Sequence, residues 1–204
     1  MRFAVLSLAT DAMHEIRDLT FPANKAWCDL HGYTWVAGNR PLDPLRPASW
    51  SKVRMIQELC KIMPGGWVFW IDADAAVVRP EWTLESIVDD NAEMIVASDR
   101  NGINTGVFMM RLGMMAWNFL ATVYDRTEYL HHRWWEQAAF MHVLDTGYPF
   151  RVKHIDKTLI NAYPGDFVEG HSAIIHVPSI PKAVRIGELK RRINYCSDPA
   201  HVSR

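Results

Sequence analysis

Two aspartates separated by one residue carry the strongest chemical signal in this sequence. Asp72 and Asp74 directly follow the apolar run WVFWI at residues 67–71. Such a run predicts a strand buried on both faces, and ligands of open α/β sheets bind beyond the carboxyl ends of strands. Because neighbouring carboxylates repel each other without a cation, the pair predicts a site for Mn²⁺, or alternatively Mg²⁺, that bridges to phosphate oxygens. The competing interpretation is a turn with a solvated Asp74.

A polar segment at residues 98–106, SDRNGINTG, precedes another apolar run. Its Asp99, Asn104 and Thr105 side chains offer the mixed donors and acceptors that sugar hydroxyls need. Asn-Gly is also an ordinary turn signal. We favour a binding site, in an irregular segment that leads into a strand starting at Gly106.

Two further candidates lie in the second half of the chain. Glu136 and Gln137 follow Trp134 and Trp135 at a predicted helix start, where a carboxylate also simply suits the helix dipole. His176 lies within an apolar strand, where a single histidine is more often a core residue. Imidazole is nevertheless a suitable Mn²⁺ ligand, and a lysine after the strand would meet a diphosphate as a point charge.

These residues sit on alternating strand and helix patterns, which predict an α/β fold with helices on both faces of the sheet. Strands are predicted at residues 2–9, 33–37, 67–71, 93–97, 106–111, 150–155 and 173–177. Helices are predicted at 13–31 (interrupted near Pro22 and ended by Gly32), from Ser49 or Ser51 to 63, and at 84–88, 113–124, 134–144 and 182–194.

Composition is that of an ordinary globular protein with one domain, residues 1–195, and a tail, residues 196–204. Hydrophobic residues make up 49% of 204, and the formal net charge of −1 argues against nucleic-acid binding. The short apolar N-terminus resembles a buried strand more than a signal peptide, and no run is long enough to span a membrane. We therefore expect a cytoplasmic protein. Three dispersed cysteines indicate neither a disulfide framework nor a zinc site.

Taken together and in this order, the segments resemble glycosyltransferases of the GT-A fold, in particular family 34, the galactosyl-, mannosyl- and xylosyltransferases. The likeness rests on residues 24–25 and 31–33, on Trp50-Ser51-Lys52, on residues 67–75, on NTGVFMMR at 104–111, on Trp135-Glu136-Gln137 and on His176. It resembles the glycogenin-like family 8 as well, whose His-x-x-Gly-x-x-Lys pattern has Ser179 in place of glycine here, between His176 and Lys182. The resemblance implies a mixed, mostly parallel, Rossmann-like sheet, and the missing stem and anchor suggest a reduced bacterial or viral version.

The resemblance also implies a metal-dependent, retaining transferase. Its donor is a nucleotide-diphosphate sugar, a UDP-sugar by family frequency, and its acceptor is a glycan or other hydroxyl compound. By analogy the metal ligands are Asp72, Asp74 and His176. The analogous donor-binding residues are Thr10, Lys52, Ala73, Thr105, Gly106 and Lys182, together with the two aspartates, and the residues at the reacting centre are Asp99, Asn104, Glu136 and Gln137.

Several alternatives stay open from the sequence. Retention could follow from attack on the face that the leaving group vacates, or from double displacement through Glu136 or Asp99 as nucleophile. A haloacid-dehalogenase-like phosphohydrolase also has D-x-D after an apolar strand, but near the chain start and with Thr or Val where this chain has Ala76. A non-catalytic nucleotide-sugar-binding module is the third option, against which the intact acidic pair argues.

Overall fold

The structure, a computed structural model, describes residues 1–197, with side chains described to residue 193. Its main sheet has the strand order β2-β1-β3-β6-β5-β7, in which β6 is antiparallel to both its neighbours and the other pairs are parallel. Two short strands, β4 and β8, form a separate antiparallel pair. The strands are β1 (Phe3–Leu8), β2 (Thr34–Gly38), β3 (Trp67–Ile71), β4 (Ala75–Val77), β5 (Met94–Asp99), β6 (Gly102–Arg111), β7 (Val152–Ile155) and β8 (Ile174–His176).

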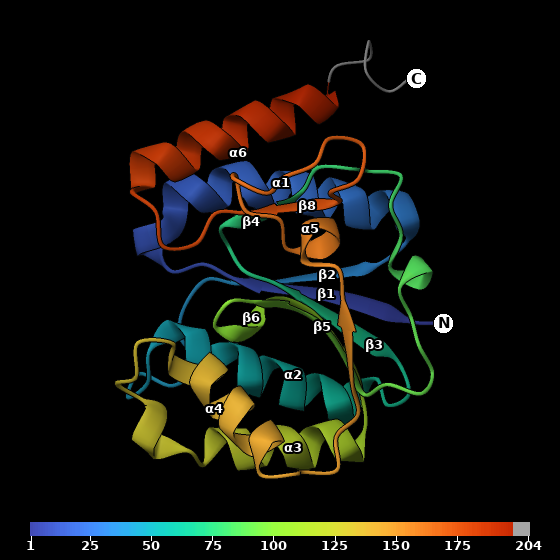
Figure 1. Cartoon of the computed structure of the whole chain (residues 1–204), viewed down its shortest axis with the longest axis vertical. Helices are drawn as coiled ribbons and strands as arrows, with labels where there is room; N and C mark the ends of the chain where they lie inside the picture. The colour runs from blue at the N-terminus through green and yellow to red at the C-terminus, as the bar shows by residue number, and fades with distance from the viewer. Residues whose placement is uncertain (198–204) are drawn as a thin grey trace.

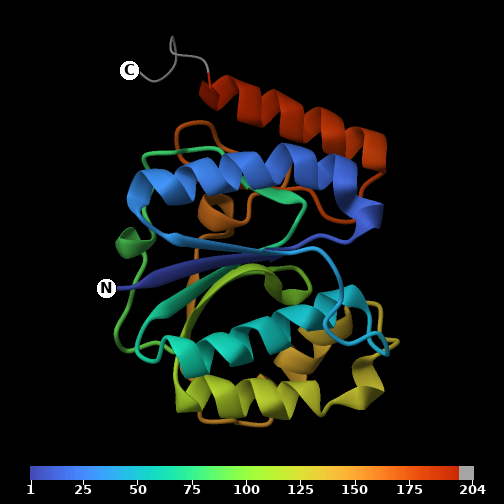
Figure 2. The same cartoon turned by 180° about the vertical axis from the view of Figure 1, so that it is seen from behind.

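Helices cover both faces of this sheet and make a three-layer molecule (Figure 1). Helices α2, α3 and α4 lie on one face, while α1, α6 and the β4–β8 pair lie on the other, as the reverse view also shows (Figure 2). The helices are α1 (His14–His31), α2 (Ser51–Ile62), α3 (Met114–Tyr124), α4 (Trp135–Asp145), α5 (Lys157–Ile160) and α6 (Lys182–Ser197). Single 3-10 turns lie at Asp11–Met13, Ala48–Trp50, Leu84–Ser86 and Thr127–Tyr129.

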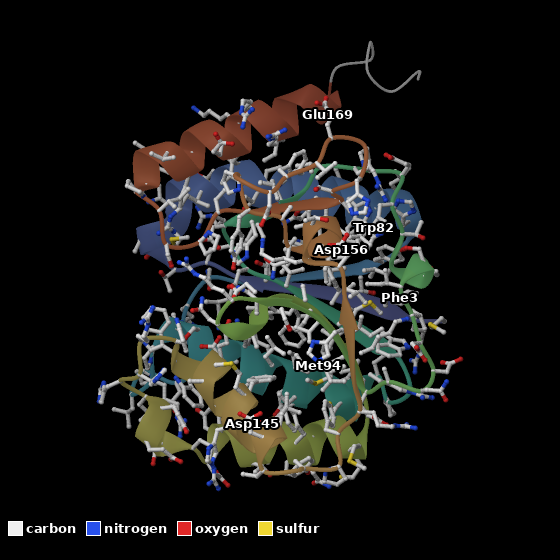
Figure 3. All side chains as sticks on the ribbon, in the orientation of Figure 1. Phe3, Trp82, Met94, Asp145, Asp156 and Glu169 are labelled. Atoms are coloured by element: carbon white, nitrogen blue, oxygen red, sulfur yellow. The ribbon has the colours of Figure 1, made fainter. Side chains whose placement is uncertain are left out.

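The two faces of the sheet bury separate apolar cores. Met94 belongs to the core against α2, α3 and α4, and Trp82 to the core on the α1 face, where Figure 3 shows both side chains. Strand β3 is buried along its whole length because alternate residues enter the two cores: Val68 and Trp70 one, and Trp67, Phe69 and Ile71 the other. The apolar run before Asp72 is therefore a central strand, as the sequence predicts.

Some element boundaries differ from the sequence predictions. Helix α1 continues through Pro22, where an interruption was predicted, because its buried face packs along the sheet on either side of that residue. Gly32 ends it in a left-handed conformation, as predicted. Ser51 does not cap α2, since its Oγ accepts a hydrogen bond from the Leu42 amide at 3.0 Å. Elements β4 and α5 were not predicted.

The largest correction concerns the polar segment at 98–106. Strand β6 begins at Gly102, so Asn104, Thr105 and Gly106 lie inside a strand that pairs with β5 through a tight turn. Helix α6 runs to Ser197, two residues into the predicted tail, and residues 198–204 lie outside the described part of the chain. Among the described residues, every helix is too short or too polar to cross a lipid bilayer.

Candidate active site

Strand register brings the two acidic and polar motifs together. The antiparallel ladder pairs Ile71 of β3 with Val107 of β6, and it continues with a hydrogen bond of 2.8 Å from the Asp72 amide to the Gly106 carbonyl. Residues 104–106 therefore lie beside Asp72, at the carboxyl end of β3. The same end of a sheet binds ligands in α/β proteins generally.

The second sheet places the histidine. In the β4–β8 pair Ala75 lies opposite His176, and the Val177 amide donates to the Asp74 carbonyl at 3.0 Å. Residues about 100 positions apart in the sequence thus become neighbours, and His176 comes next to the aspartates by backbone pairing alone.

Ligand atoms of Asp72, Asp74 and His176 all lie within 4.8 Å of one another. His176 is 2% exposed, its Nδ1 lies 2.7 Å from Asn161 Oδ1, and its Nε2 lies 3.3 Å from Asp74 Oδ1. Nε2 makes no hydrogen bond with any described residue. A buried nitrogen acceptor without a donor, facing two carboxylates, fits a divalent cation that takes nitrogen and oxygen ligands.

The environment acts differently on the two aspartates. Burial raises the pKa of Asp72, an effect that Lys52 opposes and the Asp74 carboxylate reinforces. Burial alone would raise the pKa of Asp74 as well, but the neighbouring His176 and Arg185 side chains outweigh burial and lower it. Asp74 is thus held as the carboxylate, while Asp72 gains the most from a nearby cation.

Lys52 connects the helix face to the motif strands. The side chain is 2% exposed, and Nζ lies 2.8 Å from Glu136 Oε1, 3.3 Å from Asp72 Oδ1 and 2.8 Å from the Thr105 carbonyl. Burial alone would lower the pKa of Lys52, but Asp72 and Glu136 together raise it, so the ammonium group stays charged. This lysine supplies the positive charge that the buried Glu136 carboxylate and the partly buried Asp72 carboxylate share.

Helix α4 supplies Glu136 and Gln137 to the same place. Gln137 Oε1 accepts from the Thr105 amide at 3.1 Å, and Thr105 Oγ1 donates to Glu136 Oε1 at 3.4 Å. Glu136 Oε2 is buried and has no hydrogen-bond partner among the described residues. Trp135, which precedes it, has a left-handed backbone (φ 40°) and is 47% exposed. Since bulky residues rarely adopt this conformation, it marks local strain at the start of α4.

A second polar network lies on the other side of β6. Asp99 Oδ2 accepts from Tyr163 OH at 2.7 Å and from Asn104 Nδ2 at 3.3 Å, and its Oδ1 accepts from the Asn101 amide at 2.7 Å. Burial raises the pKa of Asp99, but these hydrogen bonds and Lys157 outweigh burial, so the net pKa is lowered. Gly106 lies between the two networks, where a Cβ atom would overlap His176 Cε1 and come within 2.9 Å of Asn104 Oδ1.

A cavity of about 200 Å³ joins these groups. Nine predicted site residues line it: Lys52, Asp72, Asp99, Asn104, Thr105, Gly106, Glu136, Gln137 and His176. Asp74 adjoins it through the ligand cluster. Thr10, Ala73 and Lys182 are not in the lining. The Ala73 carbonyl accepts from Thr20 Oγ1 at 2.7 Å, and Lys182 Nζ lies 2.5 Å from Glu15 Oε1 on α1. The donor-binding roles of these three residues stay predictions.

Several residues of the cavity and its surroundings were not predicted from the sequence. Tyr163 and Asn161 follow α5, which has a weak sequence pattern, and Arg185 of α6 contacts Asp74 Oδ2 through Nη1 at 3.2 Å. Arg133, at the cavity rim, stacks its guanidinium on Trp134, 4.6 Å from the ring centroid. The sequence around Lys182 contains several basic residues, and no local pattern distinguishes Arg185 from the others.

Comparison with known sequences gives matches to about half of the chain. The model of the galactosyl transferase GMA12/MNN10 family matches residues 9–94. A probable glycosyltransferase 6 of Oryza sativa subsp. indica is 32% identical over 104 residues, which is 46% of this chain and 22% of that protein. Galactomannan galactosyltransferase 1 of Cyamopsis tetragonoloba is 31% identical over 104 residues, 46% of this chain and 24% of that protein. The chain therefore spans about a quarter of these relatives.

Comparison with solved structures extends over nearly the whole chain. A glycosyltransferase involved in the glycosylation of the major capsid of PBCV-1 superposes with a TM-score of 0.79 at 18% identity, over 94% of this chain and all of that one. The galactosyltransferase LgtC, in complex with donor and acceptor sugar analogs, gives a TM-score of 0.57 at 11% identity, over 91% and 94%. The structural comparison confirms the predicted GT-A fold, and the family-model match over residues 9–94 confirms the resemblance to family 34.

Proposed function

Given a chain with the GT-A glycosyltransferase fold and a family 34 likeness over residues 9–94, we propose that it is a metal-dependent, retaining glycosyltransferase. It moves a hexose or pentose from a nucleotide-diphosphate sugar, a UDP-sugar in the first instance, to a glycan or other hydroxyl acceptor. The cation is Mn²⁺, with Mg²⁺ as the alternative.

One observation carries this proposal: two acceptor atoms lie buried at the cavity without a donor among the described residues. They are His176 Nε2, which faces Asp74, and Glu136 Oε2, in the same cavity. Leaving such atoms without a hydrogen bond destabilises a fold. Their presence at a cavity therefore indicates that ligands bind to them. A divalent cation would satisfy the imidazole, and a hydroxyl group would satisfy the carboxylate.

The residues then take distinct roles. Asp72, Asp74 and His176 would hold the cation, which when bound neutralises the departing diphosphate as a Lewis acid. Lys52 holds the Asp72 and Glu136 carboxylates in place through its contacts at 3.3 and 2.8 Å. Such preorganised charges stabilise charge that develops in the transition state without reorganising.

The sugar-binding part of the proposal rests on the second network. Asp99 and Asn104 line the cavity and already hold each other and Tyr163 in place. Their remaining acceptor and donor capacity suits sugar hydroxyls. The exposed ring of Trp135 at the cavity provides a flat apolar surface for a sugar face. Because these groups lie beside Gly106, which separates them from the metal ligands, the donor sugar would extend from the cation toward Asp99.

A thermal-shift panel of nucleotide sugars, with and without Mn²⁺, tests the proposal. A correct donor at a hundredfold excess over its Kd stabilises the protein by about 2.7 kcal/mol, which is roughly 5–10 °C in Tm for a chain of this size. The shift should require Mn²⁺ and vanish in Asp74→Asn. A donor-dependent shift that survives EDTA would contradict the metal-dependent part.

Turnover distinguishes the remaining alternatives. Anomeric analysis of the product by NMR should show retention, and an inverted product would exclude it. Release of phosphate from simple esters without sugar transfer would favour the phosphohydrolase alternative, and donor binding without transfer to any glycan acceptor would favour a binding module.

A further inference from the structure

A cationic side chain reaches the predicted metal ligand Asp74 from an unexpected position on α6. Arg185 Nη1 lies 3.2 Å from Asp74 Oδ2, and Arg185 Nε donates to the Ile180 carbonyl at 2.8 Å. The side chain is 23% exposed, so most of it is packed. Lys182, at the position that the glycogenin-like pattern indicates, is 48% exposed and paired with Glu15 on α1 instead.

Resting on the function proposed above, we infer that Arg185 has two successive partners, first Asp74 and then the diphosphate of the donor. Without ligands the guanidinium neutralises Asp74. When a cation and a diphosphate occupy the site, the guanidinium exchanges the carboxylate for phosphate oxygens. Arginine suits this role because its planar fork binds carboxylate and phosphate in the same manner.

The charges around Asp74 support this inference. Its Oδ1 lies 3.3 Å from His176 Nε2 and its Oδ2 lies 3.2 Å from Arg185 Nη1. A basic side chain therefore lies beside each oxygen before any cation binds. A divalent cation bound to Asp74 would then lie close to a fixed positive charge, which weakens its binding in a partly buried site. The negative charges of a diphosphate relieve that repulsion, because the diphosphate contacts the cation and the guanidinium together.

The guanidinium would move only a short distance to exchange its partners. The guanidinium already touches a ligand of the cation, so phosphate oxygens bound to that cation lie within reach of a side-chain rotation. The Ile180 carbonyl that accepts from Nε belongs to the turn after Pro178 and Ser179, two residues of the cavity lining. Arg185 is thus anchored at the cavity side of α6, whereas the Lys182 ammonium is held by α1.

The consequence is a coupling between the two ligands. Arg185 should make the cation bind weakly alone and tightly with the diphosphate, and by thermodynamic reciprocity the cation should strengthen diphosphate binding equally. A side chain that only holds α6 in place would not change the two affinities in opposite directions.

Binding measurements on Arg185→Gln test the inference. Free Mn²⁺ is measured by electron paramagnetic resonance in a titration without nucleotide, and UDP is titrated calorimetrically in saturating Mn²⁺. We expect the variant to bind Mn²⁺ alone several-fold more tightly, and UDP about tenfold or more weakly, the loss typical of one charge-assisted hydrogen bond. Lys190→Gln is the matched control, an exposed cation on the same helix, and should change neither affinity.

Two results would overturn the role of Arg185, and a third would overturn the proposed function. A variant that binds Mn²⁺ alone no more tightly than wild type, or that keeps wild-type UDP affinity, overturns the role of Arg185. Wild-type protein that binds no UDP in the presence of Mn²⁺ overturns the proposed function instead. Thermal unfolding of Arg185→Gln without ligands verifies that the fold is intact, and Arg185→Lys serves as a charge-preserving variant should the glutamine variant unfold.

Discussion

At Gly106 the chain has no space for even one additional carbon atom. The Cβ of an alanine would overlap His176 Cε1 and lie 3.1 Å from Asp72 Oδ2. Both neighbours are predicted metal ligands, and the Gly106 carbonyl accepts the Asp72 amide. The absence of a side chain here therefore sets the distance between β6 and the ligand cluster.

Replacing Gly106 by alanine should separate the ligands. We expect a loss of about 1–3 kcal/mol in the free energy of unfolding, as for overpacked sites, and loss of Mn²⁺ binding in the same electron paramagnetic resonance titration. Gly113→Ala is the control, because its backbone is extended and no atom lies within 4 Å of the added carbon. An alanine variant at 106 with wild-type Mn²⁺ affinity would refute this geometry.

Asp99 gives the pH dependence of stability a definite sign. Its pKa is lowered in the folded protein, since its hydrogen bonds outweigh burial. Its contribution is present above the unfolded pKa of about 3.8 and is lost as the pH falls through the lower folded value. Asp99→Asn should therefore be less stable than wild type at pH 7, by about 1–2 kcal/mol. The difference should shrink between pH 4 and pH 2 in urea unfolding; a constant difference would contradict this.

Among the elements, α2, β3, β6 and α4 meet at the ammonium group of Lys52. Its three contacts, to Asp72, the Thr105 carbonyl and Glu136, each belong to a different element or its immediate end. A single charged group thus joins the helical layer to the strand ends that carry the motifs. The sheet alone would not keep α4 and its Glu136 at this position.

Removing the Lys52 charge should lower the free energy of unfolding, and removing the Glu136 charge as well should restore part of it. Lys52→Met leaves the buried Glu136 without its counter-charge, so we expect a loss of about 3–5 kcal/mol in unfolding free energy. The double variant Lys52→Met/Glu136→Leu removes both charges and should regain part of that loss. Denaturant unfolding of the two variants measures the difference. Equal destabilisation of both would show that charge pairing is not the cause.

The connection from β8 to α6 contains a second strained residue. Ser179 has φ 58°, the left-handed conformation that glycine adopts without strain, and it occupies the position of the glycine in the glycogenin-like pattern. Ser179→Gly relieves about 1–2 kcal/mol of strain, which increased freedom of the unfolded chain offsets in part. We expect a net gain of about 0.5 kcal/mol by thermal unfolding, with UDP affinity unchanged or higher. Destabilisation would show that the serine hydroxyl matters more than the backbone.

Over the whole molecule, the two large apolar cores on the faces of the sheet are built from side chains other than the three of the ligand cluster. Each is closed by helices and strands that do not require a cation, and Lys52 and Arg185 neutralise the aspartates when none is bound. Cation binding and folding should therefore be separable, unlike in small proteins that fold around a metal.

Chelation tests that separation. Excess EDTA should leave the circular dichroism spectrum and the Tm of the unliganded protein unchanged within about 1 °C, because ligand-free stability resides in the cores. The same treatment should abolish the nucleotide-sugar shift of the wild type. A large drop in Tm on chelation alone would show that the purified protein carries a structural metal.

The sequence by itself determined the elements whose cause is local. The unbroken apolar run of β3 followed by Asp72 and Asp74, the Gly32 helix end and the order of strands and helices all follow from patterns within a few residues. With the family resemblance, these patterns were enough to predict the GT-A fold, which the solved structures confirm, and the likeness to family 34, which the family model matches over residues 9–94. Most of the residues predicted to form the site do line one cavity.

Only the tertiary structure decided which distant residues meet. The β4–β8 register brings His176 to Asp74, the start of β6 at Gly102 places Asn104 and Thr105 inside a strand, and packing of α6 brings Arg185 to Asp74. Pro22 stays helical because contacts with the sheet outweigh its local preference. These outcomes depend on contacts between segments far apart in the chain, whose energies no local pattern contains.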